Sequence, residues 1–382
     1  MLVEDQSIRY CARIDIEDNI GQKIKAILSP DLNWAYFLER ARQEGIVSLA
    51  YKALSEIDYA KSIVPQDIWA RLERCYYTVA ARNTLLFEKM NNILNSLNQA
   101  NIEVIILKGM DLVQTIYPDI ALRPMYDIDI LIYKRDFSLV EDKLRELGYI
   151  NSPSYPEDFH KDNMMVDVHW DLMNITRVRS RNQAYQIDID EIWKSSRLKE
   201  MDGQRVRILS PEHCLMDLCL HLTLHHGLSG LIWFVDITRL IEHYKSEIDW
   251  NKFIEDSLRY KIYKPIFYVL SYVKEVLGQD VPEFVLDGLR PKGQGSLERR
   301  IFNLILSGAS LENIRFFFTL SSIENLFDRL RFLREIAIPS PRVLSARYNI
   351  THAKYIPQCY ILHFKSIFFS TSKLLKKLGD VP

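Results

Sequence analysis

Hydrophobic residues recur at helical spacing over the first hundred positions of the chain. Over residues 34–54 they predict helices interrupted at Gly45, because glycine is a poor helix former. Residues 65–97 keep the same period without interruption and begin at a proline, which suits the first turn of a helix. The pattern predicts a helical N-terminal region over residues 1–100 that ends in one long amphipathic helix.

The period of the hydrophobic pattern changes after residue 100. Short apolar or alternating runs predict three strands and a hairpin, over residues 102–107, 127–132, 164–170 and 198–209. Between them the spacing predicts two helices and one polar loop, over residues 110–116, 137–147 and 151–163. This mixture of strands and helices predicts an α/β core over residues 101–209.

From residue 210 onward the pattern is helical again. Ser210 and Pro211 combine an N-cap with a proline at the first helical position. The last helical stretch, residues 355–378, has an apolar face and several lysines, so it either packs on the body of the protein or lies on a membrane surface. The whole pattern predicts an α+β fold, in which a small mixed β-sheet lies between helical N-terminal and C-terminal regions, the latter over residues 210–382.

Composition narrows the class of partner. The 382-residue chain has a net charge of −1, so no global field draws it to nucleic acid or to an anionic membrane. No apolar run approaches the length of a membrane span, and the charged N-terminus is unlike a signal peptide. The five cysteines are scattered without a Cys-x-x-Cys pair, which argues against a disulfide framework or a zinc ribbon. We expect a cytoplasmic protein without stable membrane insertion.

The strongest chemical signal is the pair Asp127 and Asp129 in the second predicted strand. Alternate side chains of a strand share a face, so the two carboxylates point together while Ile128 and Ile130 point into a core. Carboxylate oxygens side by side are ligands that suit Mg²⁺. The sequence therefore predicts a metal site on this strand.

A phosphate site is predicted just upstream, where the first strand gives way to a helix at Gly109 and Met110. The N–H groups of a first helical turn have no partner within the helix, and the helix dipole favours an anion there. Lys108 and Arg123 could add positive charge. Metal carboxylates beside a phosphate cradle imply phosphoryl or nucleotidyl transfer.

Two of these residues have structural alternatives that the sequence leaves open. Lys108 could be a lysine at the surface end of a strand. Arg123 could be an ion-pair partner of Asp119 or Asp127.

A third carboxylate is expected from the next strand, at Asp167. It alternates with Val166 and Val168 and shares its face with His169, which could contact a phosphate or the acceptor, or could bind a neighbouring acid. A second Asp-x-Asp pair, Asp188 and Asp190, has no strand–Gly–helix unit before it and runs into a helical pattern. We interpret those acids as helix N-terminal residues placed for the dipole.

The segments ILKGMDL, YPD, RPMYDIDILI and VDVHWDL resemble a bacterial family of uncharacterised nucleotidyltransferases within the DNA polymerase β-type superfamily. The resemblance covers most of the chain, and its specific motifs lie between about Arg82 and Asp236. It implies the nucleotidyltransferase type of sheet for residues 101–209. The superfamily usually has Ser or Gly after the glycine, whereas this chain has Met110, so phosphate binding there would rest on backbone N–H groups.

The resemblance implies transfer of a nucleoside monophosphate from an NTP to an acceptor hydroxyl or phosphate, with release of pyrophosphate. Asp127 and Asp129 would hold the Mg²⁺ ion that carries the nucleotide's phosphates. Together with Asp167 they would hold a second Mg²⁺ ion, which activates the attacking hydroxyl, and Asp167 could accept its proton. The near-neutral charge favours a small molecule or a peptide over long nucleic acid as the acceptor.

Two other functions stay open at the level of sequence. The chain could be a catalytically silent relative that binds a nucleotide or a partner. It could instead be a metal-dependent phosphohydrolase built on a histidine cluster, since four histidines share one predicted helix and two of them have metal-ligand spacing: His213, His221, His225 and His226.

Overall fold

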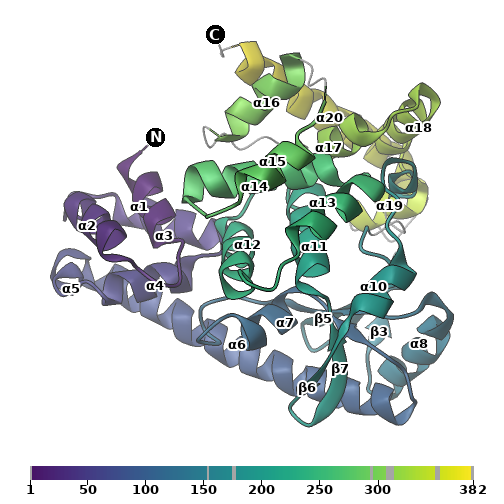
Figure 1. Ribbon diagram of the computed structural model, residues 1–382, viewed down its shortest axis with the longest axis horizontal. Helices are drawn as coiled ribbons and strands as arrows, with labels where there is room; N and C mark the ends of the chain where they lie inside the picture. Colours follow the sequence, from purple (N-terminus) through teal and green to yellow (C-terminus); the bar gives the residue numbers. More distant parts are fainter. Residues whose placement is uncertain are drawn as a thin grey trace.

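The computed structural model describes residues 2–152, 155–173, 178–292, 296–306, 314–348 and 353–379. Within them the chain forms one seven-stranded mixed sheet with helices at both ends of the sequence (Figure 1). The expected α+β fold is therefore confirmed.

Five helices form the N-terminal region, on the left of Figure 1. They are α1 (Val3–Cys11), α2 (Asp18–Ile27), α3 (Trp34–Gln43), α4 (Val47–Ser55) and α5 (Ala60–Ile63). The expected break at Gly45 is confirmed, because this glycine lies between α3 and α4 with a φ of 73°, a conformation that other residues rarely adopt.

The predicted long helix is α6 (Gln66–Gln99), which begins after Pro65. Its 34 residues span about 51 Å at about 1.5 Å per residue. Ile68 and Leu72, near its start, join the core of the N-terminal helices. Residues from Leu86 to Leu97 join a second core beneath the sheet. One amphipathic face of α6 therefore connects both cores, as its diagonal course in Figure 1 shows.

The sheet has the strand order β3-β4-β5-β2-β1-β7-β6. The strands are β1 (Ile105–Ile106), β2 (Asp127–Leu131), β3 (Ile150–Asn151), β4 (Asp158–Lys161), β5 (Met164–His169), β6 (Arg197–Met201) and β7 (Gln204–Ile208). Central β2 is parallel to β5 and antiparallel to β1. The expected hairpin around Asp202-Gly203 is confirmed by the antiparallel pair β6 and β7. Helices α7 (Lys108–Thr115) and α8 (Phe137–Glu146) follow β1 and β2 along the chain.

Two sequence expectations for the sheet were wrong in detail. The first strand is only Ile105–Ile106, because residues 102–104 precede the paired segment and Leu107 is already the N-cap of α7. The segment expected as a polar loop contains β4, whose backbone pairs antiparallel with β5. Hydrogen bonds to a neighbouring strand, rather than a hydrophobic pattern, hold these residues extended.

The chain after β5 is helical apart from the β6–β7 hairpin. Its helices are α9 (Arg181–Ala184), α10 (Ile189–Ser195), α11 (Pro211–Leu224), α12 (Leu231–His243), α13 (Trp250–Arg259), α14 (Tyr263–Leu277), α15 (Glu283–Leu289), α16 (Ser296–Leu306), α17 (Ile314–Ser322), α18 (Leu326–Ala337), α19 (Pro341–Arg347) and α20 (Ile356–Gly379). In the described part of the chain, no helix combines the length and apolarity needed to cross a membrane.

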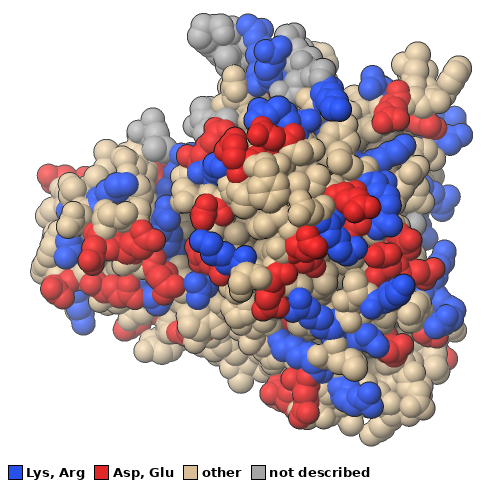
Figure 2. Space-filling model, viewed as in Figure 1, with Lys and Arg blue, Asp and Glu red and all other residues tan. Residues whose placement is uncertain are grey.

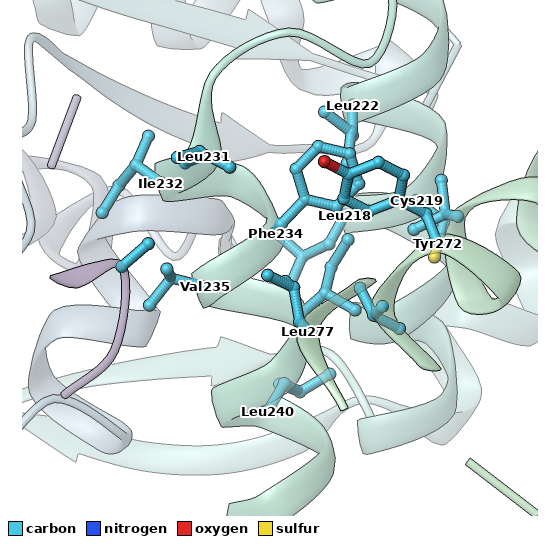
Figure 3. Close-up of a cluster of buried hydrophobic side chains, with 14 of the residues drawn as sticks. Leu218, Cys219, Leu222, Leu231, Ile232, Phe234, Val235, Leu240, Tyr272 and Leu277 are labelled. Carbon is cyan, nitrogen blue, oxygen red and sulfur yellow. The ribbon is translucent and has the colours of Figure 1, made fainter. Parts of the chain in front are cut away.

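The main core lies where α11, α12 and α14 meet. Figure 3 shows Leu218 of α11 and Phe234 of α12 beside Tyr272 of α14, and the two aromatic rings stack with their centroids 4.3 Å apart. The same buried cluster extends from Ile8 in α1 to Phe332 in α18. The division into three domains at residues 100 and 209 stays a prediction.

The predicted C-terminal helix is α20, which packs on the body and also exposes apolar surface. His363 is buried and its Nε2 lies 2.8 Å from the carbonyl oxygen of Ile336. Phe364, Phe368 and Phe369 are exposed. Basic and acidic residues are interspersed over the face shown in Figure 2, in keeping with the near-zero net charge.

Candidate active site

The predicted carboxylates lie together on one face of the sheet. Asp129 of β2 pairs directly with Asp167 of the parallel strand β5, and Asp127 lies two residues earlier on the same face. Ile128 and Ile130 point to the opposite face and are fully buried. The expected orientation of the Asp-x-Asp pair is therefore confirmed.

Lys108 and His169 both bind Asp129. The Nζ atom of Lys108 lies 2.6 Å from Oδ1 of Asp129, and Nε2 of His169 lies 2.8 Å from the same oxygen. His169 also lies 3.4 Å from Oδ2 of Asp167. Lys108 is buried, so the alternative of a surface lysine is wrong.

These side chains fit a divalent cation by their chemistry. One ligand atom from each of Asp129, Asp167 and His169 lies within 4.8 Å of the others, the only such group of three or more in the part of the chain that the structure describes. Carboxylate oxygens suit Mg²⁺ and Mn²⁺. Asp127 is outside this group but lies two residues before Asp129 on the same face, so it is placed to add a further oxygen.

The buried charges at the site shift one another's pKa values. Burial alone would raise the pKa of Asp129, but the ammonium of Lys108 and the imidazole of His169 lower it well below the usual range. Burial and the neighbouring Asp129 raise the pKa of Asp127 to about 6. For Lys108, burial opposes the charge, yet Asp129, Asp217 and Asp167 raise its pKa overall. A dense cluster of acids therefore surrounds one buried lysine.

The predicted phosphate site is the start of α7. Leu107, the N-cap, is extended, and its N–H donates to the carbonyl of Asp129, which fixes the helix start beside the carboxylates. Lys108 has a φ of 52°, a left-handed conformation that costs a non-glycine residue about 1–3 kcal/mol. Met110 is buried. The chain therefore turns sharply at Lys108 to direct the first turn of α7 at the site.

Gly109 is required by a close approach. A Cβ atom at this position would lie 2.2 Å from Nη1 of Arg123 and 3.1 Å from Sδ of Met125. Arg123 is itself held in place, since its Nη2 lies 2.9 Å from Oδ2 of Asp236 and its guanidinium lies over the ring of Trp233. The glycine therefore lets a buried arginine pack directly against the first turn of α7.

The ion-pair partner of Arg123 differs from the two that the sequence suggested. It is Asp236 of α12, neither Asp119 nor Asp127. Tyr117 donates to the other oxygen of Asp236 at 2.7 Å. Asp119 instead accepts from the N–H of Ala121 and from the hydroxyl of Tyr76. The YPD segment is therefore a structural corner that joins α6 and α12.

Asn83 of α6 fixes the segment that carries Arg123. Its Nδ2 donates to the carbonyls of Ile120 and Arg123 at 2.7 and 2.8 Å, and its Oδ1 accepts from the N–H of Met125. The side chain is fully buried. The sequence signalled Asn83 in two ways, as a polar residue on the apolar face of a predicted helix and as a position shared with the resembled family, but neither gave its role.

Asp217 is a site residue that sequence reasoning missed. It lies on α11, is buried, and its Oδ2 has no hydrogen-bond partner among the described residues. Burial raises its pKa to about 6, while Lys108 and His169 act to lower it. An acid within the apolar run of residues 214–220 was the signal that could have revealed it.

The histidine cluster is compact but does not form a three-ligand metal group. The rings of His221 and His225 stack with centroids 5.1 Å apart, and Nε2 of His221 lies 2.9 Å from Nε2 of His226. His213 lies at the other end of α11, where its Nδ1 contacts Ser195 and Ser210. Within the described residues, these imidazoles do not join an acid in a three-ligand arrangement.

The second Asp-x-Asp pair lies at a helix start. Asp188 is the N-cap of α10, where its Oδ1 accepts from the N–H of Glu191. Asp190 lies in the first turn of the same helix. The interpretation of these acids as helix N-terminal residues is therefore confirmed.

Carboxylates on neighbouring strands beside a helix start are the arrangement expected of a nucleotidyltransferase. A family model described as an uncharacterised nucleotidyltransferase matches residues 30–278. The match covers more than half of the chain, so the protein belongs to this nucleotidyltransferase family. A search of the curated proteins finds no match.

Proposed function

We propose that this protein transfers a nucleoside monophosphate from an NTP to a hydroxyl or phosphate of an acceptor and releases pyrophosphate. The observation that carries the proposal is the direct pairing of Asp129 with Asp167, with Asp127 on the same face and the start of α7 beside them. Family membership supports the general activity.

Asp127, Asp129 and Asp167 would hold two Mg²⁺ ions. When bound, the metal would neutralise charge on the phosphates and lower the pKa of the attacking hydroxyl. His169 contacts both Asp129 and Asp167, so it orients the two carboxylates toward each other. The chain would supply a fixed set of acids, because Asp129 and Asp167 are held in register by the sheet.

Lys108 and the first turn of α7 would bind the phosphates of the NTP. Lys108 keeps its charge, since three acids raise its pKa, and its ammonium already lies against Asp129. The backbone N–H groups of Gly109 and Met110 belong to the first turn, where the helix dipole favours an anion. Arg123 supports this turn from beneath through its bond to Asp236.

In the proposed reaction the acceptor oxygen bonds to the α-phosphorus of the NTP. The bond from that phosphorus to the bridging oxygen breaks, and pyrophosphate leaves with that oxygen. Where the acceptor is a hydroxyl, Asp167 takes its proton. One P–O bond forms and one breaks, so the reaction balances without any further reactant.

Isotope position tests this proposal. The protein is incubated with a small-molecule extract and with NTP labelled at either the α or the γ phosphorus. Nucleotidyl transfer places the α label in a new product and the γ label in pyrophosphate, and Asp167→Asn abolishes both. A γ label in the product would instead show phosphoryl transfer. NTP binding without movement of either label would favour the silent relative.

A further inference from the structure

A large cavity lies between the carboxyl ends of β2 and β5 and the C-terminal helices, lined by Lys134 after β2 and Trp170 after β5. Its volume is about 830 Å³, within the range of small-molecule sites. Trp170, which directly follows His169 of β5, lines one wall. His225 lines another and stacks on His221 of α11. The cavity therefore begins one residue beyond His169, at the end of β5.

Basic side chains outnumber acidic ones among the described residues that line this cavity. Five basic side chains of the described residues line it, from three segments of the chain: Lys134, Arg179, Arg181, Arg342 and Arg347. Among the described lining residues the acids are Glu157 and Glu335. Glu335 already accepts hydrogen bonds from the backbone N–H groups of Arg179 and Ser180, so its charge is engaged locally. The balance favours an anion, and guanidinium groups bind phosphate oxygens well.

Glu157 adds a buried hydrogen-bond acceptor to this basic cavity. It is only 4% exposed, and its Oε1 has no hydrogen-bond partner in the part of the chain that the structure describes. Its backbone carbonyl accepts from the N–H of Val168, which places Glu157 opposite Val168, and the next residue, Asp158, pairs with Asp167. A buried carboxylate oxygen without a donor is costly, and a ligand hydroxyl would satisfy it.

We propose that this cavity binds the acceptor, and that the acceptor is a small hydroxylated molecule that carries a phosphate group. The arginines Arg179 and Arg342 bind the phosphate, and Glu157 accepts a hydrogen bond from a hydroxyl. The proposal rests on the proposed function, because it assigns the second substrate of the same reaction. It also separates the two substrates, with the NTP at Lys108 and the acceptor beyond Trp170.

Inorganic phosphate is the probe for the cavity, titrated without Mg²⁺ or NTP at constant ionic strength. Wild type is compared with Arg179→Gln/Arg342→Gln, whose side chains are both exposed. The control is Arg290→Gln, another exposed arginine that does not line the cavity. We expect saturable binding below about 10 mM that weakens about tenfold in the double variant and is unchanged in the control.

A second titration, with Mg²⁺ and ATP, separates this proposal from the proposed function. We expect the arginine double variant to bind the nucleotide as wild type does, and Asp127→Asn/Asp129→Asn to lose it while still binding phosphate. If wild type does not bind phosphate, or if the arginine variant binds phosphate as tightly as wild type, the assignment of the cavity to the acceptor is overturned. The proposed nucleotidyl transfer is not affected by either result. Loss of nucleotide binding in the arginine variant would show that the cavity binds the NTP, and this result would also overturn the assignment of the cavity to the acceptor.

Discussion

At the scale of single residues, the buried pair of Arg123 and Asp236 packs against the first turn of α7. Their side chains are 4% and 0% exposed, and Tyr117 donates to the same carboxylate. Removing one partner of a buried ion pair leaves the other charge without compensation. The pair therefore links α12 to the start of α7 through Gly109.

We predict that Asp236→Asn lowers the free energy of unfolding by about 3–5 kcal/mol, because Arg123 loses its compensating charge in a buried setting. Urea unfolding followed by circular dichroism measures this. The matched control is Asp280→Asn, whose ion pair with Lys245 is largely exposed and whose loss changes stability by at most about 1 kcal/mol. Equal effects of both substitutions would contradict the structural role of Asp236.

A second residue-scale prediction concerns Gly109. We expect Gly109→Ala to cost about 1–3 kcal/mol, because the new methyl group would collide with the pinned guanidinium of Arg123. Gly21→Ala in α2 is the control, since its Cβ would meet only Ile16 at 3.6 Å and alanine favours a helix. The midpoint temperature of thermal unfolding should fall in Gly109→Ala and should not fall in Gly21→Ala. An unchanged unfolding midpoint in Gly109→Ala would contradict this, because it would show that the Arg123 side chain can move aside at no cost.

At the scale of elements, α11 combines a well-formed N-terminus with a buried histidine. Ser210 caps the helix by accepting from the N–H of His213. Nδ1 of His213 lies 2.9 Å from the hydroxyl of Ser195, and Nε2 has no hydrogen-bond partner among the described residues. Burial lowers the pKa of His213 below its ordinary value of 6.5. The positive end of the helix dipole also disfavours a charged imidazole there.

This geometry predicts a pH dependence of stability. Since the folded pKa of His213 lies below 6.5, the unfolded chain binds the proton first as the pH falls. The contribution of this histidine is fully present above pH 6.5 and is lost below it, by up to about 1.4 kcal/mol per pH unit. Urea unfolding at pH 7.5 and 5.5 should show a smaller loss in His213→Gln than in wild type. The exposed His160→Gln should behave as wild type, and identical losses in all three proteins would contradict the argument.

Elements with a strong local pattern were predictable from the sequence. The helix α6, the strands β2 and β5 and the hairpin of β6 and β7 all match their expected ranges closely, because each carries its own period or turn residues. The strand β4 was missed, since its residues Asp158–Lys161 are held by pairing with β5 rather than by a pattern. The length of β1 was overestimated for the opposite reason, since its apolar run continues past the sheet.

The candidate site likewise contains residues that the local sequence pattern predicts and residues that it does not. The shared face of Asp127 and Asp129 follows from strand geometry, and Asp167 follows from the next alternating strand. The partner of Arg123 is 113 residues away, and no local rule selects Asp236 among the acids of the chain. Asp217 likewise reaches the site through the packing of a distant element, α11. Local spacing therefore gave the carboxylates, and tertiary packing decided their surroundings.

At the scale of the whole molecule, α6 connects the two hydrophobic cores. Its first half packs with the N-terminal helices and its second half with the sheet that carries the site. We predict that Glu88→Pro, at an exposed position in its middle, lowers the free energy of unfolding by about 3 kcal/mol or more. Glu88→Ala is the control and should leave it nearly unchanged.

The same variant tests whether the cores unfold together. Because α6 belongs to both, signals from tryptophans and from backbone circular dichroism should shift by the same amount in Glu88→Pro. Separate transitions for the two signals would show that the N-terminal helices and the sheet region are independent units. That result would support a domain boundary near residue 100.

The central claim is that Asp127, Asp129 and Asp167 form a metal and triphosphate site. Isothermal titration of each NTP with Mg²⁺ tests it most directly, on wild type and on Asp127→Asn/Asp129→Asn. The matched control is Asp188→Asn/Asp190→Asn, the same motif at the start of α10, where an asparagine N-cap preserves the helix. We predict Mg²⁺-dependent binding of at least one NTP by wild type and by the control, and its loss in the first variant. Binding that survives in Asp127→Asn/Asp129→Asn, or no binding of any NTP by folded wild type, would contradict the claim.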